Sequence, residues 1–410
     1  MTRLDSEIMT PRLLLAARRA RESRWDEVDA LAQDAWTEYI PVHDGMRNAN
    51  ARTLDLVHRR FGQAIGDRIG TTMYDELMTW HLGRSSYVPS FREHVEQTAM
   101  NWHWHRTLFR IAELPDRVSF YLEPCGSGGR MINEGAYYQS AKRPLSLIPE
   151  PSQATFGEKN FPSWCAHCAD SNRSFLARGH NLIMHEGWTP AHRYGACAAH
   201  IFKSYAEIPD EYFSRVGLTA PSTPRRKKGV ENPRVFSDAE LEELAASPID
   251  RIRSAADERD LARLLTLVED SWQAWMTLHD AYRCWFWMLG GALRDEFGEV
   301  EALELLAESA WEMVAQVVEA AGGSDEYAWA RYWRAHGVQC TVDRREDGTV
   351  FGVSASALVQ RDVGGDWGAS REAMIVEAIM SGVRANGQEG AFGTLRLGSQ
   401  QDELVHVLPG

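Results

Sequence analysis

The sequence predicts a predominantly helical α+β protein, built as a tandem duplication of a helical bundle with a small antiparallel β element. Three observations predict it: apolar residues recur at helical spacing, short strand patterns follow them, and two stretches of the chain repeat. A zinc-binding insertion, predicted from cysteine spacing, distinguishes the first copy from the second.

The repeat aligns residues 25–62 with residues 261–298 without a gap, in the shared order W-x6-H-D-x2-R-x13-F-G. The spacing of its polar residues makes them neighbours on a helix. Both copies keep them, and only the first copy carries other reactive groups. A buried structural network is therefore favoured over an active-site role for His43, Asp44 and Arg47 and for His279, Asp280 and Arg283.

The elements of the two copies are expected in the same order. Apolar residues spaced by three and four predict a helix from Leu261 to Trp275. Further helices are expected over residues 42–61 and 278–297 and, after them, over residues 73–80 and 303–318. The segment 101–106, with two Trp and two His, is expected to be helical, and short strands are expected over residues 117–122 and 348–353.

Changes in composition along the chain predict its division into segments. We expect a first repeat with a Gly-rich cysteine loop over residues 1–150, a metal-binding segment over 151–218, a linker over 219–233 and a scaffold repeat over 234–410. The linker contains prolines and the basic run 225–228, and Ser237-x-x-Glu240 has the capping-box spacing of a helix start directly after it.

Charge and composition exclude several classes of partner. The formal net charge of −14 disfavours binding to nucleic acid and to anionic membranes, because both would repel the chain. The N-terminus has no signal-peptide pattern, and no apolar stretch is long enough to span a bilayer. The sequence therefore predicts a cytoplasmic protein with a small-molecule substrate. It leaves open whether the chain forms a homo-oligomer.

Soft metal ligands are concentrated in the first half of the chain. Cys165-x2-Cys168 is followed, after a long gap, by Cys197-x2-His200, which we expect at the opening of a helix. Two close pairs joined by a loop suit a tetrahedral zinc site. Alternatively, Cys125 with the other three cysteines holds iron or an iron–sulfur cluster, or the thiols are buried and unlinked.

A glycine-rich loop follows the first predicted strand. Its backbone N–H groups and its arginine predict an anion site formed by Gly126, Ser127, Gly128, Gly129 and Arg130. A thiol in this setting should have a lowered pKa, so Cys125 is a candidate nucleophile or metal ligand. Glu123, His185 and Glu186 are candidates for acid–base work. Residues 353–358, the corresponding segment of the second copy, contain neither cysteine nor glycine.

The leading hypothesis from these patterns is a zinc-containing enzyme that acts on a small organic acid or amide-like substrate by hydrolysis or lyase chemistry. The alternatives are a non-catalytic small-molecule sensor or carrier with a structural zinc, an iron or iron–sulfur protein, and a scaffold that exposes its basic linker to a partner.

Overall fold

The computed structural model describes most of the chain, namely residues 7–83, 89–138, 141–186, 197–222, 232–321, 325–337, 340–346, 348–354, 368–398 and 403–409. Within these residues the protein is mostly helical with small antiparallel sheets, which confirms the predicted α+β class. None of the helices there is both long and apolar enough to cross a membrane. Most of the expected linker, residues 223–231, lies outside the described residues.

The chain divides into two compact units. The terminal unit combines residues 1–53 with residues 249–410, and the central unit comprises residues 54–248. Helix α3 (Val28–Phe61) begins in the terminal unit and ends in the central one.

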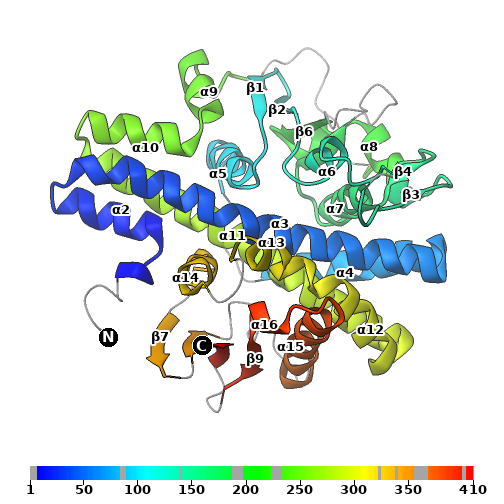
Figure 1. Ribbon diagram of the computed structural model, residues 1–410. Helices are drawn as coiled ribbons and strands as arrows, with labels where there is room; N and C mark the ends of the chain where they lie inside the picture. The colour runs from blue at the N-terminus through cyan, green and yellow to red at the C-terminus, as the bar shows by residue number, and fades with distance from the viewer. Residues whose placement is uncertain are drawn as a thin grey trace. The chain divides into compact units, whose positions relative to one another are not determined.

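Two long helices form the centre of the terminal unit. The first part of α3 lies beside α11 (Leu261–Phe297), where Asn50 Nδ2 donates to the carbonyl of Tyr282 at 3.1 Å (Figure 1). Two helices were expected in each of these two stretches, but α3 and α11 are each one continuous helix, and Pro41 lies within α3. Both helices stop at a glycine with left-handed φ, +86° at Gly62 and +87° at Gly298.

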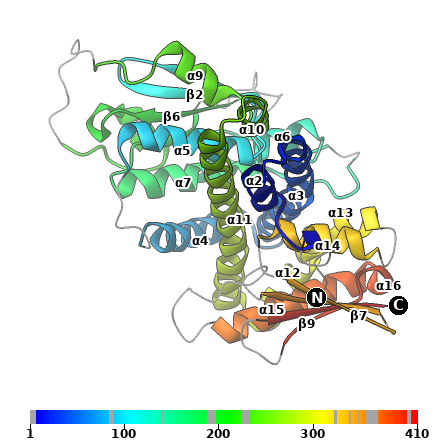
Figure 2. The ribbon, with the colours of Figure 1, turned by 90° about the vertical axis from the view of Figure 1, so that its left-hand side faces the viewer.

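The rest of the terminal unit consists of shorter helices and one sheet. The helix expected over 303–318 is two helices, α12 and α13, and the strand expected over 348–353 is confirmed as β8 (Gly348–Ser354). The antiparallel sheet has the order β7-β8-β10-β9, and α15 lies against it (Figure 2). The other elements are α2 (Arg12–Arg21), η1 (Trp25–Glu27), α10 (Pro248–Asp257), α12 (Glu299–Ala310), α13 (Glu312–Ala321), α14 (Glu326–Ala335), β7 (Cys340–Arg345), α15 (Gly368–Ala385), α16 (Glu389–Phe392), β9 (Thr394–Leu397) and β10 (Glu403–Pro409).

The central unit contains a second four-stranded antiparallel sheet, of order β1-β2-β6-β5. The strand expected over 117–122 is confirmed as β2, the segment around Trp102 is helical, and the Ser237 capping box begins α9. The elements are α4 (Gln63–Gly83), α5 (Phe91–Trp104), β1 (Phe109–Glu113), β2 (Arg117–Leu122), α6 (Gly128–Asn133), β3 (Leu147–Ile148), η2 (Gln153–Thr155), β4 (Phe161–Pro162), η3 (Ser163–Cys165), α7 (Ala166–Ala177), β5 (Leu182–Glu186), β6 (Cys197–Phe202), η5 (Tyr205–Glu207), α8 (Asp210–Arg215) and α9 (Asp238–Ala245).

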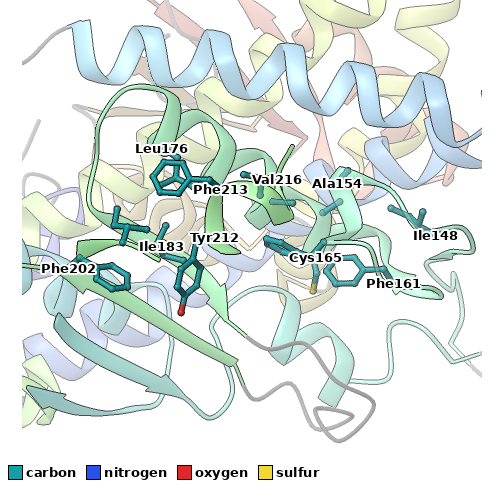
Figure 3. Packing of buried hydrophobic residues seen from close by; sticks show 14 residues of the cluster. Ile148, Ala154, Phe161, Cys165, Leu176, Ile183, Phe202, Tyr212, Phe213 and Val216 are labelled. Atoms are coloured by element: carbon teal, nitrogen blue, oxygen red, sulfur yellow. The ribbon is translucent and has the colours of Figure 1, made fainter. Parts of the chain in front are cut away.

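An apolar cluster fixes α7 in the central unit. Leu176 on the helix packs with Ile183 and Phe202 of the sheet and with Phe213 of α8 (Figure 3). At the other end of the cluster, Cys165 lies near Phe161. Burial of these side chains therefore determines where the start of α7, with its two cysteines, is held.

Candidate functional site

Cys125 lies on a short loop that follows β2 through a cis Glu123–Pro124 peptide bond. Close packing holds this loop. The Gly126 N–H donates to Thr107 Oγ1 at 2.9 Å, and a Cβ on Gly126 would come within 1.4 Å of the His105 carbonyl oxygen. Gly126 therefore allows two backbone segments to approach more closely than any side chain would permit.

Cys165 and Cys168 lie on one turn at the start of α7. Cys165 precedes the helix and is buried, and Cys168 follows in its first turn and is half-buried. A Cβ on Gly128 would lie 2.5 Å from Cys165 Sγ. The glycine at position 128 thus lets the loop after Cys125 contact the first cysteine of α7.

Cys197 is placed by strand pairing. It begins β6, and the register of β6 with β2 pairs Cys197 with Leu122. Since Cys125 comes three residues after Leu122, this register brings the two thiols to the same end of the sheet.

These four cysteines form a thiol cluster, the name used below for Cys125, Cys165, Cys168 and Cys197. Each pair among the four interacts, either by a hydrogen bond or electrostatically. Cys165 is buried and the other three are half-buried, and each is a free thiol.

The four thiols of the cluster differ in pKa. A hydrogen bond from the Cys197 thiol, together with N–H and hydroxyl donors of Gly129 and Ser127, lowers the pKa of Cys125 to about 6 against the opposing effect of burial. The Gly129 N–H lies 3.0 Å from Cys125 Sγ. Cys197, as the hydrogen-bond partner of Cys125, has a pKa well above its ordinary value. Burial and the nearby thiols raise the pKa of Cys165 and Cys168 well above the ordinary value. The first thiolate of the cluster thus forms at Cys125.

His200, expected as the fourth ligand, lies elsewhere. Its Nδ1 is 2.9 Å from Ser119 Oγ, and its ring packs near Phe202 and Tyr212. The segment was expected to open a helix, but it is strand β6, in which residues three apart point to opposite faces. Cys197 and His200 therefore face opposite sides of the sheet, and Cys125 takes the place expected for the histidine.

The thiols are not drawn together as they are around a bound ion. Among the residues that the structure describes, no group of three or more His, Cys, Asp or Glu side chains has an arrangement that would hold a metal. A metal-binding form of the cluster would need its sulfurs to turn inward, which for a cysteine means a change of side-chain rotamer.

The glycine loop directs its donors inward. The Gly126 and Gly129 N–H groups are occupied by Thr107 and Cys125, and Arg130 donates to Glu134 Oε1 at 2.7 Å. Gly126, Gly128 and Gly129 do not adopt left-handed φ. Gly126 and Gly128 are needed because neighbouring atoms approach so closely. The loop serves its own cysteine, and the structure shows no donors of Gly126 or Gly129 directed at an external anion.

The expected acid–base residues are placed as follows. Glu123 is exposed and pairs with Arg110 at 2.7 Å. The backbone of His185 and Glu186 belongs to β5, where Glu186 pairs with Ala198 of β6, and their side chains lie outside the described residues.

Comparison with known proteins finds no relative of this chain. No protein-family model, no curated protein and no solved structure matches the chain.

Sequence reasoning missed one group of residues in the central unit. Asp67 and Thr71 of α4 and Asp170 of α7 line a common pocket. No motif marks them, because they come from helices about a hundred residues apart whose packing is a tertiary property.

Proposed function

We propose that this chain is a metal-containing enzyme whose ion is held by the thiol cluster. The observation that carries the proposal is the mutual interaction of all four thiols. A loop, a helix start and a strand each contribute to the cluster. Four sulfurs in one place are the donor set of zinc and also of iron and iron–sulfur centres.

Charge supports the same proposal. Burial and neighbouring acidic groups all oppose ionisation of Cys165 and Cys168. A bound soft cation would reverse this opposition, because it stabilises thiolates directly. Binding should therefore release protons and should be favoured by rising pH.

For the reaction we propose hydrolysis or lyase chemistry on a small organic acid or amide-like substrate, with zinc as the ion. Bound zinc would supply Lewis acidity. A site that keeps four protein ligands is structural, so catalysis needs one ligand that can leave. Cys125 lies on a loop, whereas the other three thiols lie at the ends of regular elements, so Cys125 is the ligand best placed to exchange.

Metal-free thiol chemistry is a second candidate. It is favoured by the hydrogen bond between Cys125 and Cys197 and by the lowered pKa of Cys125. In this case Cys125 would act as the nucleophile, and Cys197 would hold the proton that the pair shares.

Metal analysis tests the proposal. The purified protein should contain about one equivalent of zinc, which Cys168→Ser should lose and Cys340→Ser, a change outside the cluster, should retain. If the protein instead contains iron and is coloured, the iron or iron–sulfur alternative replaces the zinc site. Absence of any metal from all three preparations would overturn the metal centre in favour of thiol chemistry. If the protein contains metal but turns over no small acid or amide, the result would indicate a non-catalytic sensor or carrier.

We also infer that the scaffold arose by duplication. The two sheets have corresponding strand orders, β1-β2-β6-β5 and β7-β8-β10-β9, and each follows a long helix that stops at a left-handed glycine. Tyr39 and Trp275 hold equivalent repeat positions, and their rings meet edge to face with centroids 3.8 Å apart, as expected near a pseudo-twofold axis. An experimental structure in which β2–β6 and β8–β10 fail to superpose would contradict this inference.

A further inference from the structure

A pocket of about 360 Å³ lies between α4 and α7 in the central unit. Its size falls in the range of small-molecule sites and exceeds what a bare ion requires. The walls carry charges of both signs and only a few small apolar groups. The lining residues are Asp67, Arg68, Thr71, Ser152, Gln153, Ala154, Ala169, Asp170, Arg173 and Val216.

The negative groups of this pocket are Asp170 and Asp67. Asp170 is only 5% exposed, and its Oδ1 accepts a hydrogen bond from Thr71 Oγ1 at 2.7 Å. Asp170 approaches α4 closely because residue 70 is glycine, where a Cβ would lie 3.1 Å from Asp170 Oδ2. Asp67 interacts electrostatically with Asp170, and its Oδ1 is buried without a hydrogen-bond partner among the described residues.

The positive groups of this pocket are Arg173 and Arg68. The Arg173 side chain is 24% exposed, and its terminal nitrogen donates to Asp75 at 2.9 Å. Its Nε is buried and has no hydrogen-bond partner within the described part of the chain. Arg68, on the same wall as Asp67, is exposed. The pocket therefore brings two carboxylates and two guanidinium groups together, and Asp170 is the most buried of the four.

We propose that this pocket binds a small zwitterion, a molecule that carries both an ammonium and a carboxylate group. The ammonium would face Asp67 and Asp170, where an added positive charge relieves the repulsion of two carboxylates. The carboxylate would face Arg173, whose guanidinium is suited to it. Ala154, Ala169 and Val216 leave room for a short apolar portion between the charges.

This inference deepens the proposed function by naming the class of small organic acid. It rests on that function only for turnover, because binding does not require the thiols. Asp170 and Arg173 share α7 with Cys168, but the pocket and the thiol cluster have no residue in common.

Calorimetric titration of the full chain tests the proposal. The probes are L-valine, β-alanine and γ-aminobutyrate, compared with isobutylamine, which lacks the acid of valine, and isovalerate, which lacks its amine. At least one zwitterion should bind at least tenfold more tightly than the two single-charge analogues. Asp67→Asn should weaken that binding at least tenfold, whereas Asp116→Asn, an exposed change in the same unit, should leave it unchanged.

Several results with the parent protein and Asp67→Asn would overturn the proposal. They are failure of every zwitterion to bind, equal binding of isobutylamine, or binding of MgCl2 that depends on Asp67 while the zwitterions do not bind. Thermal unfolding of Asp67→Asn checks that the variant is folded. Titration of Cys168→Ser separates the two sites, because zwitterion binding should survive there even if the metal is lost, and loss of binding would also contradict the proposal.

Discussion

The thiols of Cys125 and Cys197 share a hydrogen bond although the two residues lie far apart in the chain. Pairing of β6 with β2 places Cys197 opposite Leu122, and the loop after Leu122 returns Cys125 to it. One proton is thus held between two sulfurs, and the pair titrates as a unit.

Alkylation of Cys125 should report this relationship. With a pKa of about 6, Cys125 should be mostly thiolate at pH 7, and its reaction with iodoacetamide in chelator-treated protein should reach half of its maximum near pH 6. Burial raises the pKa of Cys340 to about 12, so that thiol should stay unreactive. Peptide mapping by mass spectrometry measures both.

A matched pair of variants tests the cause of the lowered pKa. Cys197→Ala removes the donor, so the pKa of Cys125 should rise, whereas Cys197→Ser keeps an O–H donor and should hold it low. An unchanged alkylation profile in Cys197→Ala would show that the backbone donors alone set the pKa.

The glycines beside the cluster should not tolerate alanine. A Cβ at Gly126 would meet the His105 carbonyl at 1.4 Å, and a Cβ at Gly128 would meet Cys165 Sγ at 2.5 Å. We expect Gly128→Ala to cost about 1–3 kcal/mol of unfolding free energy and Gly126→Ala to cost more, because backbone must move. Gly390→Ala, which has no atom within 4 Å, is the control. Denaturant unfolding measures all three, and equal stabilities would refute this packing.

Glu113 should contribute a pH-dependent part of the stability of the central unit. Its carboxylate accepts hydrogen bonds from the backbone N–H groups of Val235 and Phe236, both at 2.8 Å, and pairs with Lys203 at 2.5 Å. Burial by itself raises the pKa of Glu113, but the Lys203 hydrogen bond and the backbone donors together outweigh it and lower the pKa. The stabilisation is therefore present above the ordinary carboxyl pKa and is lost as the pH falls through the lowered value.

Glu113→Gln keeps the shape of the side chain and removes its charge. Because the Glu113 side chain is 1% exposed and that of Lys203 is 8% exposed, we expect a loss of about 2–4 kcal/mol at pH 7 and a shallower acid dependence. Glu123→Gln breaks an exposed pair and should change the free energy of unfolding by less than about 1 kcal/mol. Similar losses in the two variants would contradict the role of Glu113.

His406 should make the terminal unit sensitive to acid. Its ring is fully buried, with Nδ1 accepting from Trp333 Nε1 at 3.0 Å and Nε2 donating to the Phe392 carbonyl at 2.6 Å. Burial lowers its pKa from 6.5 to about 4. The unfolded state therefore binds a proton first, and about 3 kcal/mol of stability should disappear as the pH falls from 6.5 to 4.

His406→Phe removes this titration. The variant should be less stable at pH 7, because two buried polar groups lose their partner, but its stability should fall less steeply between pH 6.5 and 4. Thermal unfolding followed by near-UV circular dichroism gives both slopes, and parallel slopes in variant and parent would exclude His406 as the sensor.

Local patterns in the sequence were reliable where local chemistry decides the outcome. The apolar spacing around Leu264 predicted a helix, Ser237 with Glu240 predicted a helix start, and the strand beginning at Arg117 was found as predicted. The glycines after Cys125 drew attention to this loop, but the close approach of neighbouring atoms that requires Gly126 and Gly128 cannot be read from one segment of the sequence.

By itself, the sequence determined the helical α+β class, the concentration of thiols in the first half of the chain and the position of one strand in each four-stranded sheet, β2 and β8. Only the tertiary structure decided that Cys125 rather than His200 joins Cys165, Cys168 and Cys197, because strand direction and register set which side chains share a face. Likewise, only helix packing brought Asp67 and Asp170 into one pocket, since no local pattern encodes the contact of helices distant in the chain.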